Sequence, residues 1–449
     1  MKQTPETERV VGIDPAWIVV VAGVSAALHV GKLPPAIPAL RDALGLSLLQ
    51  AGFMLSLVQF AGMALGIFVG LAADTLGLRR SMLAGLVTLS TAGVAGGFAT
   101  DPAMLLSLRA LEGFGFLLAS MPGPSLIRQL VPAARLSSTL GLWGTYMPLG
   151  TALALLIGSI VLGHFRWPIW WWLVAAQSGL VSLWLWRAVP SDAERERRRT
   201  THRAASPQTP APSQPQPAPK RSRKTDLAKP NLHRAGWTRR LLATLSARGP
   251  WLVALCFAVY SAQWLSVIGF LPSIYAAAGV ASGAIGGLTA LAAAVNIIGN
   301  IAAGRLLQRG VRPQWLLWTG FAAMIVGAAV TFAQVGGAAL PPALRYGGVL
   351  LFSALGGMIP ATLFALAVRR APSEDTVSTT VGWMQQWSSI GQFAGPPLVA
   401  ALAAQAGGWQ WTWAATGTCA LVGMLIAALL AERSASPVVQ IAAATGKRA

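Results

Sequence analysis

Long apolar stretches separated by short polar breaks dominate this chain of 449 residues. A helix needs about 20 apolar residues to cross roughly 30 Å of hydrocarbon, and twelve stretches are about that long. We expect membrane-spanning helices over 16–40, 49–72, 81–99, 103–127, 138–162, 168–188, 250–275, 283–303, 314–334, 344–367, 379–404 and 411–431. The pattern therefore predicts an all-α membrane protein with twelve transmembrane helices.

The second six segments repeat features of the first six. Met121-Pro122 corresponds to Ile359-Pro360 at an offset of 238 residues, and 137–141 resembles 378–382 at an offset of 241. We therefore predict two pseudo-symmetric six-helix bundles. The expected domains are 1–190 as the N-terminal bundle, 191–247 as a disordered basic cytoplasmic linker, 248–432 as the C-terminal bundle, and 433–449 as a cytoplasmic tail.

Composition excludes an ordinary soluble domain, because 54% of the residues are hydrophobic and only 11% are charged. The net charge of +20 does not indicate nucleic-acid binding, because residues 187–248 alone hold fifteen Lys or Arg against four acids. That basic segment is expected to lie on anionic lipid at the membrane surface. The two cysteines, far apart inside apolar runs, predict neither a disulfide nor a metal site.

Arginines in the short loops set the expected orientation. The loops on one side hold Arg79, Arg80, Arg128, Arg135, Arg305, Arg309, Arg312, Arg369 and Arg370, against Arg41, Arg166 and Arg345 on the other. The positive-inside rule then places both termini in the cytoplasm of a multi-pass protein of the cell (inner or plasma) membrane. Tryptophans at the opposite side are expected to be interfacial anchors: Trp167, Trp170, Trp171, Trp172, Trp409, Trp411 and Trp413.

Four ionisable residues lie inside the predicted spans, where each costs at least ~2.5 kcal/mol. They are His29 and Lys32 on 16–40, and Arg109 and Glu112 on 103–127. The helical rise puts all four about 6–13 Å below the same membrane surface, and each i,i+3 pair shares one helix face. Three groups that can be cationic against one acid favour an anionic or carboxylate-bearing solute.

As a hypothesis, Lys32 and Arg109 contact that solute, with His29 nearby, while Glu112 or His29 exchanges a proton. An ion-pair network that only orients the two helices is the alternative. The second half offers uncharged groups that could reach the solute by hydrogen bonds, namely Tyr260, Gln263, Asn296 and Gln385. Prolines 34, 35, 38 and 272 indicate kinks at corresponding ends of two helices, either gates at the outer mouth or static bends.

A short polar turn at 70–80 carries a known spacing. Gly70, Asp74, Gly77, Arg79 and Arg80 form the pattern G-x-x-x-D-x-x-G-x-R-R, which resembles the loop between helices 2 and 3 in the major facilitator superfamily of secondary transporters. The resemblance implies a cytoplasmic gating turn, in which we expect Asp74 to pair with Arg128 or to cap a helix of the other half. The second copy, at 300–312, has no acid at the matching place.

The run 105–115, with Arg109 followed by Gly113-Phe114-Gly115, resembles the helix-4 motif of the same superfamily. That resemblance implies a central cavity containing Arg109 and a link to proton coupling. Glu112 stands where an amide is more usual, so it is either the protonation site or the counter-ion of Arg109. The segments 31–35, 109–115 and 141–144 are also similar to the cyanate and nitroimidazole permease branch, and 141–150 lacks the Gly-Pro of drug antiporters.

We therefore predict a monomeric secondary transporter that moves a small anionic solute by alternating access, as a proton symporter. The alternatives are an exporter of hydrophobic compounds or drugs and a non-transporting membrane scaffold that uses the basic linker. No phosphate-binding glycine motif and no paired metal ligands occur, so we predict no enzyme, no cofactor, no metal and no nucleic-acid partner.

Overall fold

Helices contain almost all of the residues that the computed structural model describes, which are 14–132, 135, 139–140, 142–195, 197, 232–373 and 376–431. Within these ranges, the side chains of 69–76, 232–235, 237, 335, 378 and 431 are not described. The first group of helices is α1 (Pro15–Gly31), α2 (Leu33–Leu44), α3 (Leu48–Ser56), η1 (Leu57–Gln59), α4 (Phe60–Leu76), α5 (Leu78–Gly96), α6 (Pro102–Ser120), α7 (Gly123–Leu130), α9 (Tyr146–His164) and α10 (Trp167–Ala188).

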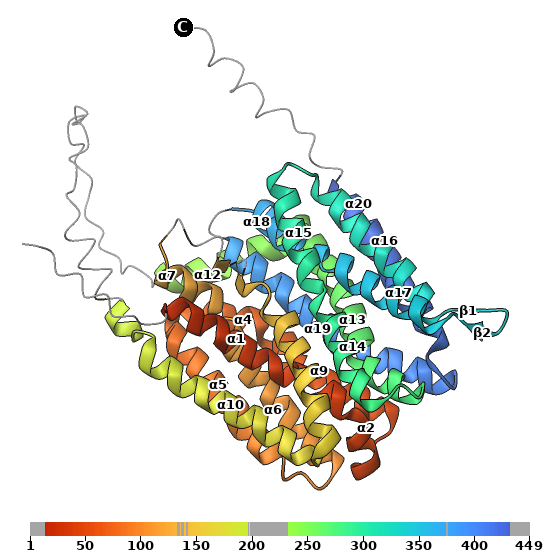
Figure 1. The fold of residues 1–449 in the computed structure, drawn as a ribbon. Coiled ribbons are helices and arrows are strands. Elements are labelled where there is room, and N and C mark those ends of the chain that lie inside the picture. The colour runs from red at the N-terminus through yellow and green to blue at the C-terminus, as the bar shows by residue number, and fades with distance from the viewer. Residues whose placement is uncertain are drawn as a thin grey trace, which may run out of the picture.

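The second group begins after the helix α12 (Leu232–Ser246). It consists of α13 (Arg248–Ala277), α14 (Ser282–Ala294), α15 (Asn296–Gln308), α16 (Pro313–Phe332), α17 (Pro342–Gly356), α18 (Met358–Arg370), α19 (Val377–Gln405), η3 (Trp409–Trp411) and α20 (Thr412–Ala431). A short antiparallel hairpin, β1 (Gln334–Val335) and β2 (Ala338–Ala339), joins α16 to α17. Figure 1 shows the two groups as adjacent bundles, red to yellow and green to blue.

These helices confirm the predicted all-α membrane fold. Ten of the described helical segments are long and apolar enough to cross a membrane. The other two predicted spans are also helices, α5 and α19. Arg79 and Arg80 lie at the start of α5, and α19 carries several Gln, Ser and Thr residues. These polar residues make both helices less apolar than the ten.

Interruptions in the helices recur in the two bundles. The 3₁₀ turn at Leu57 separates α3 from α4, and Val295, 238 residues later, separates α14 from α15. Likewise α6 ends just before Met121-Pro122, and α17 ends near the matching Ile359-Pro360. This correspondence supports the repeat seen in the sequence.

The first helix breaks at Lys32, which is both the last cap of α1 and the first cap of α2. Pro34 and Pro35 follow after Leu33 and have no N–H to donate to the preceding turn, which explains the interruption. Pro272, by contrast, lies within the continuous helix α13. Of the two predicted kinks, the one in the N-terminal bundle is therefore an interruption between α1 and α2, whereas α13 of the C-terminal bundle is continuous through Pro272.

The seam between the bundles is formed by α19 against α3 and α4, α9 against α14, and α2 against α13. Gln386 of α19 donates from Nε2 to the Met63 carbonyl at 2.8 Å and accepts from the Ile67 N–H at 3.2 Å. Gly66 makes room for it, since a Cβ there would lie 3.2 Å from the Gln386 Cβ. An amide side chain thus fastens α19 to the backbone of α4.

Part of the predicted disordered linker is folded, because residues 232–246 form α12. This helix packs on α13 and α19, where the Trp251 Nε1 donates to the Leu245 carbonyl at 2.8 Å and Thr244 is fully buried. Basic composition suggested disorder, but these contacts give the segment a packed face. Residues 198–231 and 432–449 lie outside the described residues.

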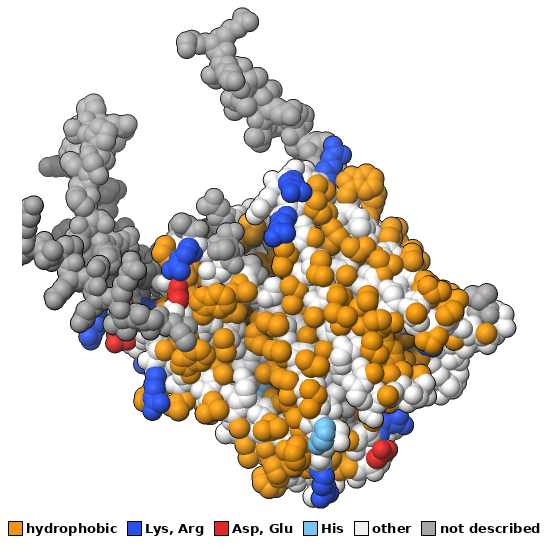
Figure 2. Space-filling view, in the orientation of Figure 1, with side chains coloured by type: hydrophobic (Ala, Val, Ile, Leu, Met, Phe, Trp, Pro, Cys, Tyr) orange, Lys and Arg blue, Asp and Glu red, His pale blue; other side chains and the backbone are white. Residues whose placement is uncertain are grey.

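The surface is broadly apolar between its ends, as Figure 2 shows, with Lys and Arg gathered near the edges of this view. Leu180, Ile160, Leu398 and Leu425 are each more than half exposed on mid-helix positions. A wide apolar band of this kind is expected where side chains face lipid rather than water.

We predict that Gly85→Ala weakens the N-terminal bundle by about 1–3 kcal/mol, because the added methyl overfills a close helix contact. A Cβ at Gly85 of α5 would lie 2.6 Å from the Gly115 carbonyl oxygen of α6, and backbone cannot easily move aside. Thermal unfolding of the purified protein measures the change. Gly347→Ala on α17 is the control, since its Cβ would meet nothing within 4 Å; equal stability of the two variants would contradict the prediction.

Candidate functional site

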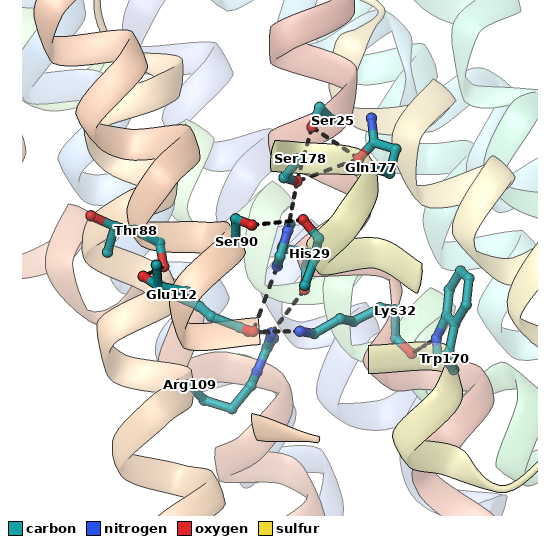
Figure 3. A network of polar contacts seen from close by, with 12 residues as sticks. Ser25, His29, Lys32, Thr88, Ser90, Arg109, Glu112, Trp170, Gln177 and Ser178 are labelled. Atoms are coloured by element: carbon teal, nitrogen blue, oxygen red, sulfur yellow. Dashed lines mark hydrogen bonds and ion pairs between the residues drawn. The ribbon is translucent and has the colours of Figure 1, made fainter. Parts of the chain in front are cut away.

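The four ionisable residues predicted inside the membrane meet in one cluster, which Figure 3 shows from close by. Glu112 of α6 is at its centre. Its Oε1 accepts from the Lys32 Nζ, and its Oε2 accepts from the Arg109 Nη1 at 2.5 Å. The Nδ1 of His29 lies 3.5 Å from the same Oε1. We call these four residues the Glu112 cluster.

Backbone carbonyls hold Arg109 in place. Its Nε donates to the Met54 carbonyl at 3.2 Å, and its Nη1 also donates to the His29 carbonyl at 2.8 Å. Small residues allow this close approach, because a Cβ at Gly113 would lie 2.6 Å from the Val58 carbonyl oxygen. The guanidinium therefore joins α1, α3 and α6, while its Nη2 has no hydrogen-bond partner among the described residues.

Two tryptophans of α10 complete the surroundings of Lys32. The ammonium lies 4.7 Å from the centre of the Trp171 ring, a cation–π contact, and the Trp170 Nε1 donates to the Lys32 carbonyl at 2.8 Å. Both rings are buried, as is Trp167. The prediction that these three are interfacial anchors is therefore wrong, because they fill the bundle interior; Trp172, Trp411 and Trp413 are exposed as expected.

His29 connects the cluster to a group of hydroxyls that the sequence analysis missed. Its Nε2 lies 2.9 Å from the Ser178 Oγ, which in turn lies 3.0 Å from the Ser25 Oγ. Gln177 Oε1 accepts from both serines, at 3.0 and 3.3 Å. A signal was present, because Gln177-Ser178 interrupts the apolar run 168–188 and Ser25 precedes His29 by about one helical turn.

The Glu112 cluster is enclosed, with each of its side chains at most 1% exposed. Its members and their partners come from α1, α3, α6 and α10, all in the N-terminal bundle. In this conformation the cluster does not face solvent, so contact between a solute and Lys32 or Arg109 stays a prediction.

The predicted polar residues of the C-terminal bundle form a separate group. Asn296 donates from Nδ2 to the Tyr260 hydroxyl at 3.1 Å and to the Ser353 carbonyl at 2.9 Å. Gln263 donates from Nε2 to the Val259 carbonyl at 2.8 Å, and its Oε1 has no partner in the described part of the chain. Gln385 is partly exposed. No hydrogen bond or ion pair between described residues joins this group to the Glu112 cluster, so the structure does not bring the two sets into contact.

At the predicted gating turn, the acid that caps α5 is Asp192. Its Oδ1 accepts from the Arg79 N–H at 3.1 Å and its Oδ2 from the Arg80 N–H at 3.2 Å, where a negative charge stabilises a helix N-terminus. Gly77 makes the turn with φ of 88°, and Arg195 forms an ion pair with Asp192. The side chains at Gly70 and Asp74 are outside the described set, so the pairing of Asp74 with the exposed Arg128 is untested.

No group of three or more His, Cys, Asp or Glu among the described residues is arranged to hold a metal ion. Cys256 and Cys419 are both free thiols, the first buried and the second partly buried.

Comparison with known proteins gives one family for most of the chain. The family described as Major Facilitator Superfamily matches residues 19–396. The puromycin resistance protein pur8 of Streptomyces alboniger is 31% identical over 160 residues, and the niacin transporter NiaP of Acinetobacter baylyi is 30% identical over 155 residues. The alignment with pur8 covers 35% of this chain and 31% of pur8. The alignment with NiaP covers 34% of this chain and 35% of NiaP, so this chain matches about a third of the length of each relative.

A solved structure resembles the whole fold. The bacterial homolog to the human lysosomal transporter Spinster, in an inward-facing and occupied conformation, aligns with a TM-score of 0.70 at 14% identity. That alignment covers 96% of this chain and 97% of the homolog. At this identity the likeness concerns the fold alone.

We predict that Glu112→Gln destabilises the protein by about 3–5 kcal/mol, because it leaves two buried cations without their shared carboxylate. Thermal unfolding measures the loss, with Asp42→Asn, at an exposed acid, as the matched control. Adding Lys32→Met to Glu112→Gln should recover part of the stability, since it removes one of the unpaired charges. Equal stability of Glu112→Gln and Asp42→Asn would contradict a structural role for this carboxylate.

Proposed function

The chain belongs to the Major Facilitator Superfamily and is a secondary transporter of that type, and we propose that its solute is a small anion, most simply a carboxylate, moved together with protons. Transport would use alternating access, in which the two bundles rock around a site between them. The residues proposed to carry it are Lys32 and Arg109 for the solute and Glu112 with His29 for the proton.

The charge balance of the Glu112 cluster carries the proposal. Lys32 and Arg109 are two cations that share one carboxylate, so the cluster holds one excess positive charge when His29 is neutral. A buried charge without a partner is costly. The Arg109 Nη2 is buried and has no partner among the described residues, so it is a ready donor for a second carboxylate, which binds a guanidinium well through paired hydrogen bonds.

Proton coupling follows from competition for the same cations. A solute carboxylate that binds Lys32 and Arg109 would displace Glu112 from them. In an apolar interior, a carboxylate that has lost its cationic partners favours the protonated form. Anion binding and proton uptake would then accompany each other, with Glu112 as the group that gains the proton.

Access to the cluster requires a conformation other than the enclosed one. The helices that carry the charges are both interrupted, α1 at Lys32 itself and α6 at Met121-Pro122. Such interruptions allow one part of a spanning helix to move relative to the other. They support a model in which the ends of these helices open the cluster to one side of the membrane.

The relatives favour two different solute classes. NiaP is named for niacin, a small carboxylate, whereas pur8 is named for resistance to puromycin. The second name keeps the export of hydrophobic compounds or drugs as an alternative. In that case apolar and aromatic contacts would matter more than Lys32 and Arg109.

A paired thermal-shift screen separates these classes. We expect small carboxylates, nicotinate among them, to raise the unfolding temperature more than their neutral amides do, here nicotinamide. A ligand at 100 times its Kd stabilises a protein by about 2.7 kcal/mol. For the best carboxylate, uptake into proteoliposomes should increase with an imposed proton gradient.

Arg109→Ala and Lys32→Ala should each abolish the difference between carboxylate and amide, whereas Arg345→Ala, in the first turn of α17, should retain it. If puromycin stabilises the protein and no carboxylate does, the anion proposal is wrong and the export alternative is favoured. If a carboxylate is transported without any response to the proton gradient, the solute class holds and proton coupling fails.

A further inference from the structure

The His29 ring lies between Glu112 on one side and the hydroxyls of Ser25 and Ser178 on the other, as Figure 3 shows. We propose that Ser178 and Gln177 are positioning residues, which keep neutral His29 protonated on Nε2 and leave an empty proton position between its Nδ1 and Glu112 Oε1. The part that this position plays in transport rests on the proposed function, but the protonation pattern can be tested without it.

A count of hydrogen atoms leads to the assignment. The Gln177 Oε1 can only accept, and it lies within hydrogen-bond distance of both serine hydroxyls. Ser25 donates its one hydrogen to Gln177 at 3.0 Å, and Ser178 donates its own either to Gln177 at 3.3 Å or to Ser25 at 3.0 Å. Ser178 Oγ then has only lone pairs left for the His29 Nε2, 2.9 Å away. If Ser178 donated to Nε2 instead, only the Ser25 hydrogen would remain for the three contacts among Ser25, Ser178 and Gln177, so we assign Nε2 as the donor.

A neutral imidazole with its hydrogen on Nε2 has a lone pair on Nδ1. This lone pair lies 3.5 Å from Glu112 Oε1, and Nδ1 makes no hydrogen bond among the described residues. Two acceptors facing each other without a hydrogen explain both the separation and the missing bond. One added proton would turn this gap into a charge-assisted hydrogen bond.

The charges around His29 determine when that proton arrives. Among the described residues, the charged groups that face it are Glu112 and Arg109 from α6 and Lys32 from α1. The neighbouring α5 presents Gly93, where a Cβ would lie 3.4 Å from the His29 Cε1, and α10 presents Ser178. Lys32 and Arg109 oppose an imidazolium, so an anion bound to them would make the proton easier to accept.

The proton balance of the step is simple. A hydrated proton of the aqueous phase, reaching the cluster in an open conformation, adds to Nδ1 and forms the imidazolium, with Nε2–H still bonded to Ser178. The Nδ1 proton then passes to Glu112 Oε1 once the solute has displaced that carboxylate from Lys32. Glu112 becomes a neutral acid, and His29 returns to its starting form with the hydrogen on Nε2.

Nitrogen-15 NMR of the full chain, labelled on histidine and held in lipid nanodiscs, tests the assignment. His29→Asn identifies the His29 signals among the four histidines. We expect wild-type His29 at neutral pH to be neutral and protonated on Nε2. Ser178→Ala should shift the ratio of the two neutral forms at least about fivefold toward Nδ1–H, the equivalent of one lost hydrogen bond.

Ser178→Thr, which keeps the hydroxyl, should restore the wild-type ratio. Ser90→Ala is the matched control, because Ser90 donates to the Ala175 carbonyl at 2.8 Å nearby but makes no bond to His29; it should leave the ratio unchanged. A wild-type His29 protonated on Nδ1, or a Ser178→Ala variant with an unchanged ratio, would overturn the proposal. If the NMR results hold while a proton gradient fails to drive uptake, the positioning stands and proton coupling is what fails.

Discussion

One carboxylate, that of Glu112, must serve two buried cations, and this constraint determines the local structure of the N-terminal bundle. An ammonium and a guanidinium in an apolar interior are stable only when paired. The backbone supports that pairing. Lys32 stands where α1 gives way to α2, and Arg109 also binds the carbonyls of Met54 and His29. The helices that meet at the cluster are therefore held by charge as well as by close packing.

The two bundles share a fold but differ in their polar interiors. The N-terminal bundle encloses four ionisable side chains, Glu112 and the three around it, whereas the group around Asn296 in the C-terminal bundle uses a phenol, an amide and backbone carbonyls. The helix interruptions recur in both, so the repeat preserves the places where the helices break and not the chemistry beside them. Under the proposed function, this division would give recognition of charge to the first bundle and hydrogen bonding to the second.

Much of the fold could be predicted from the sequence, because apolar length and polar breaks are local signals. The convergence of His29, Lys32, Arg109 and Glu112 could also be foreseen, since helical rise and spacing fix their depth and face. Sequence could not show that Trp170 and Trp171 turn inward, because a tryptophan near a helix end suits an interface and a core equally well. Nor could it show that Asp192, more than 100 residues away in sequence, caps α5, because that contact depends on tertiary packing.

Enclosure of the Glu112 cluster affects the free energy of the closed conformation. Closing protein around Lys32, Arg109 and a single carboxylate removes water from an excess positive charge, which raises the free energy of the closed, empty state. Under the proposed function, an anion that enters before closure, while Glu112 is still ionised, cancels that excess, so closure then costs less with solute bound than without it. A ligand shifts a conformational equilibrium only by its differential affinity for the two states, and here the charge balance supplies that difference. The ion pairs that stabilise the bundle would then also link solute binding to the movement that carries it across the membrane.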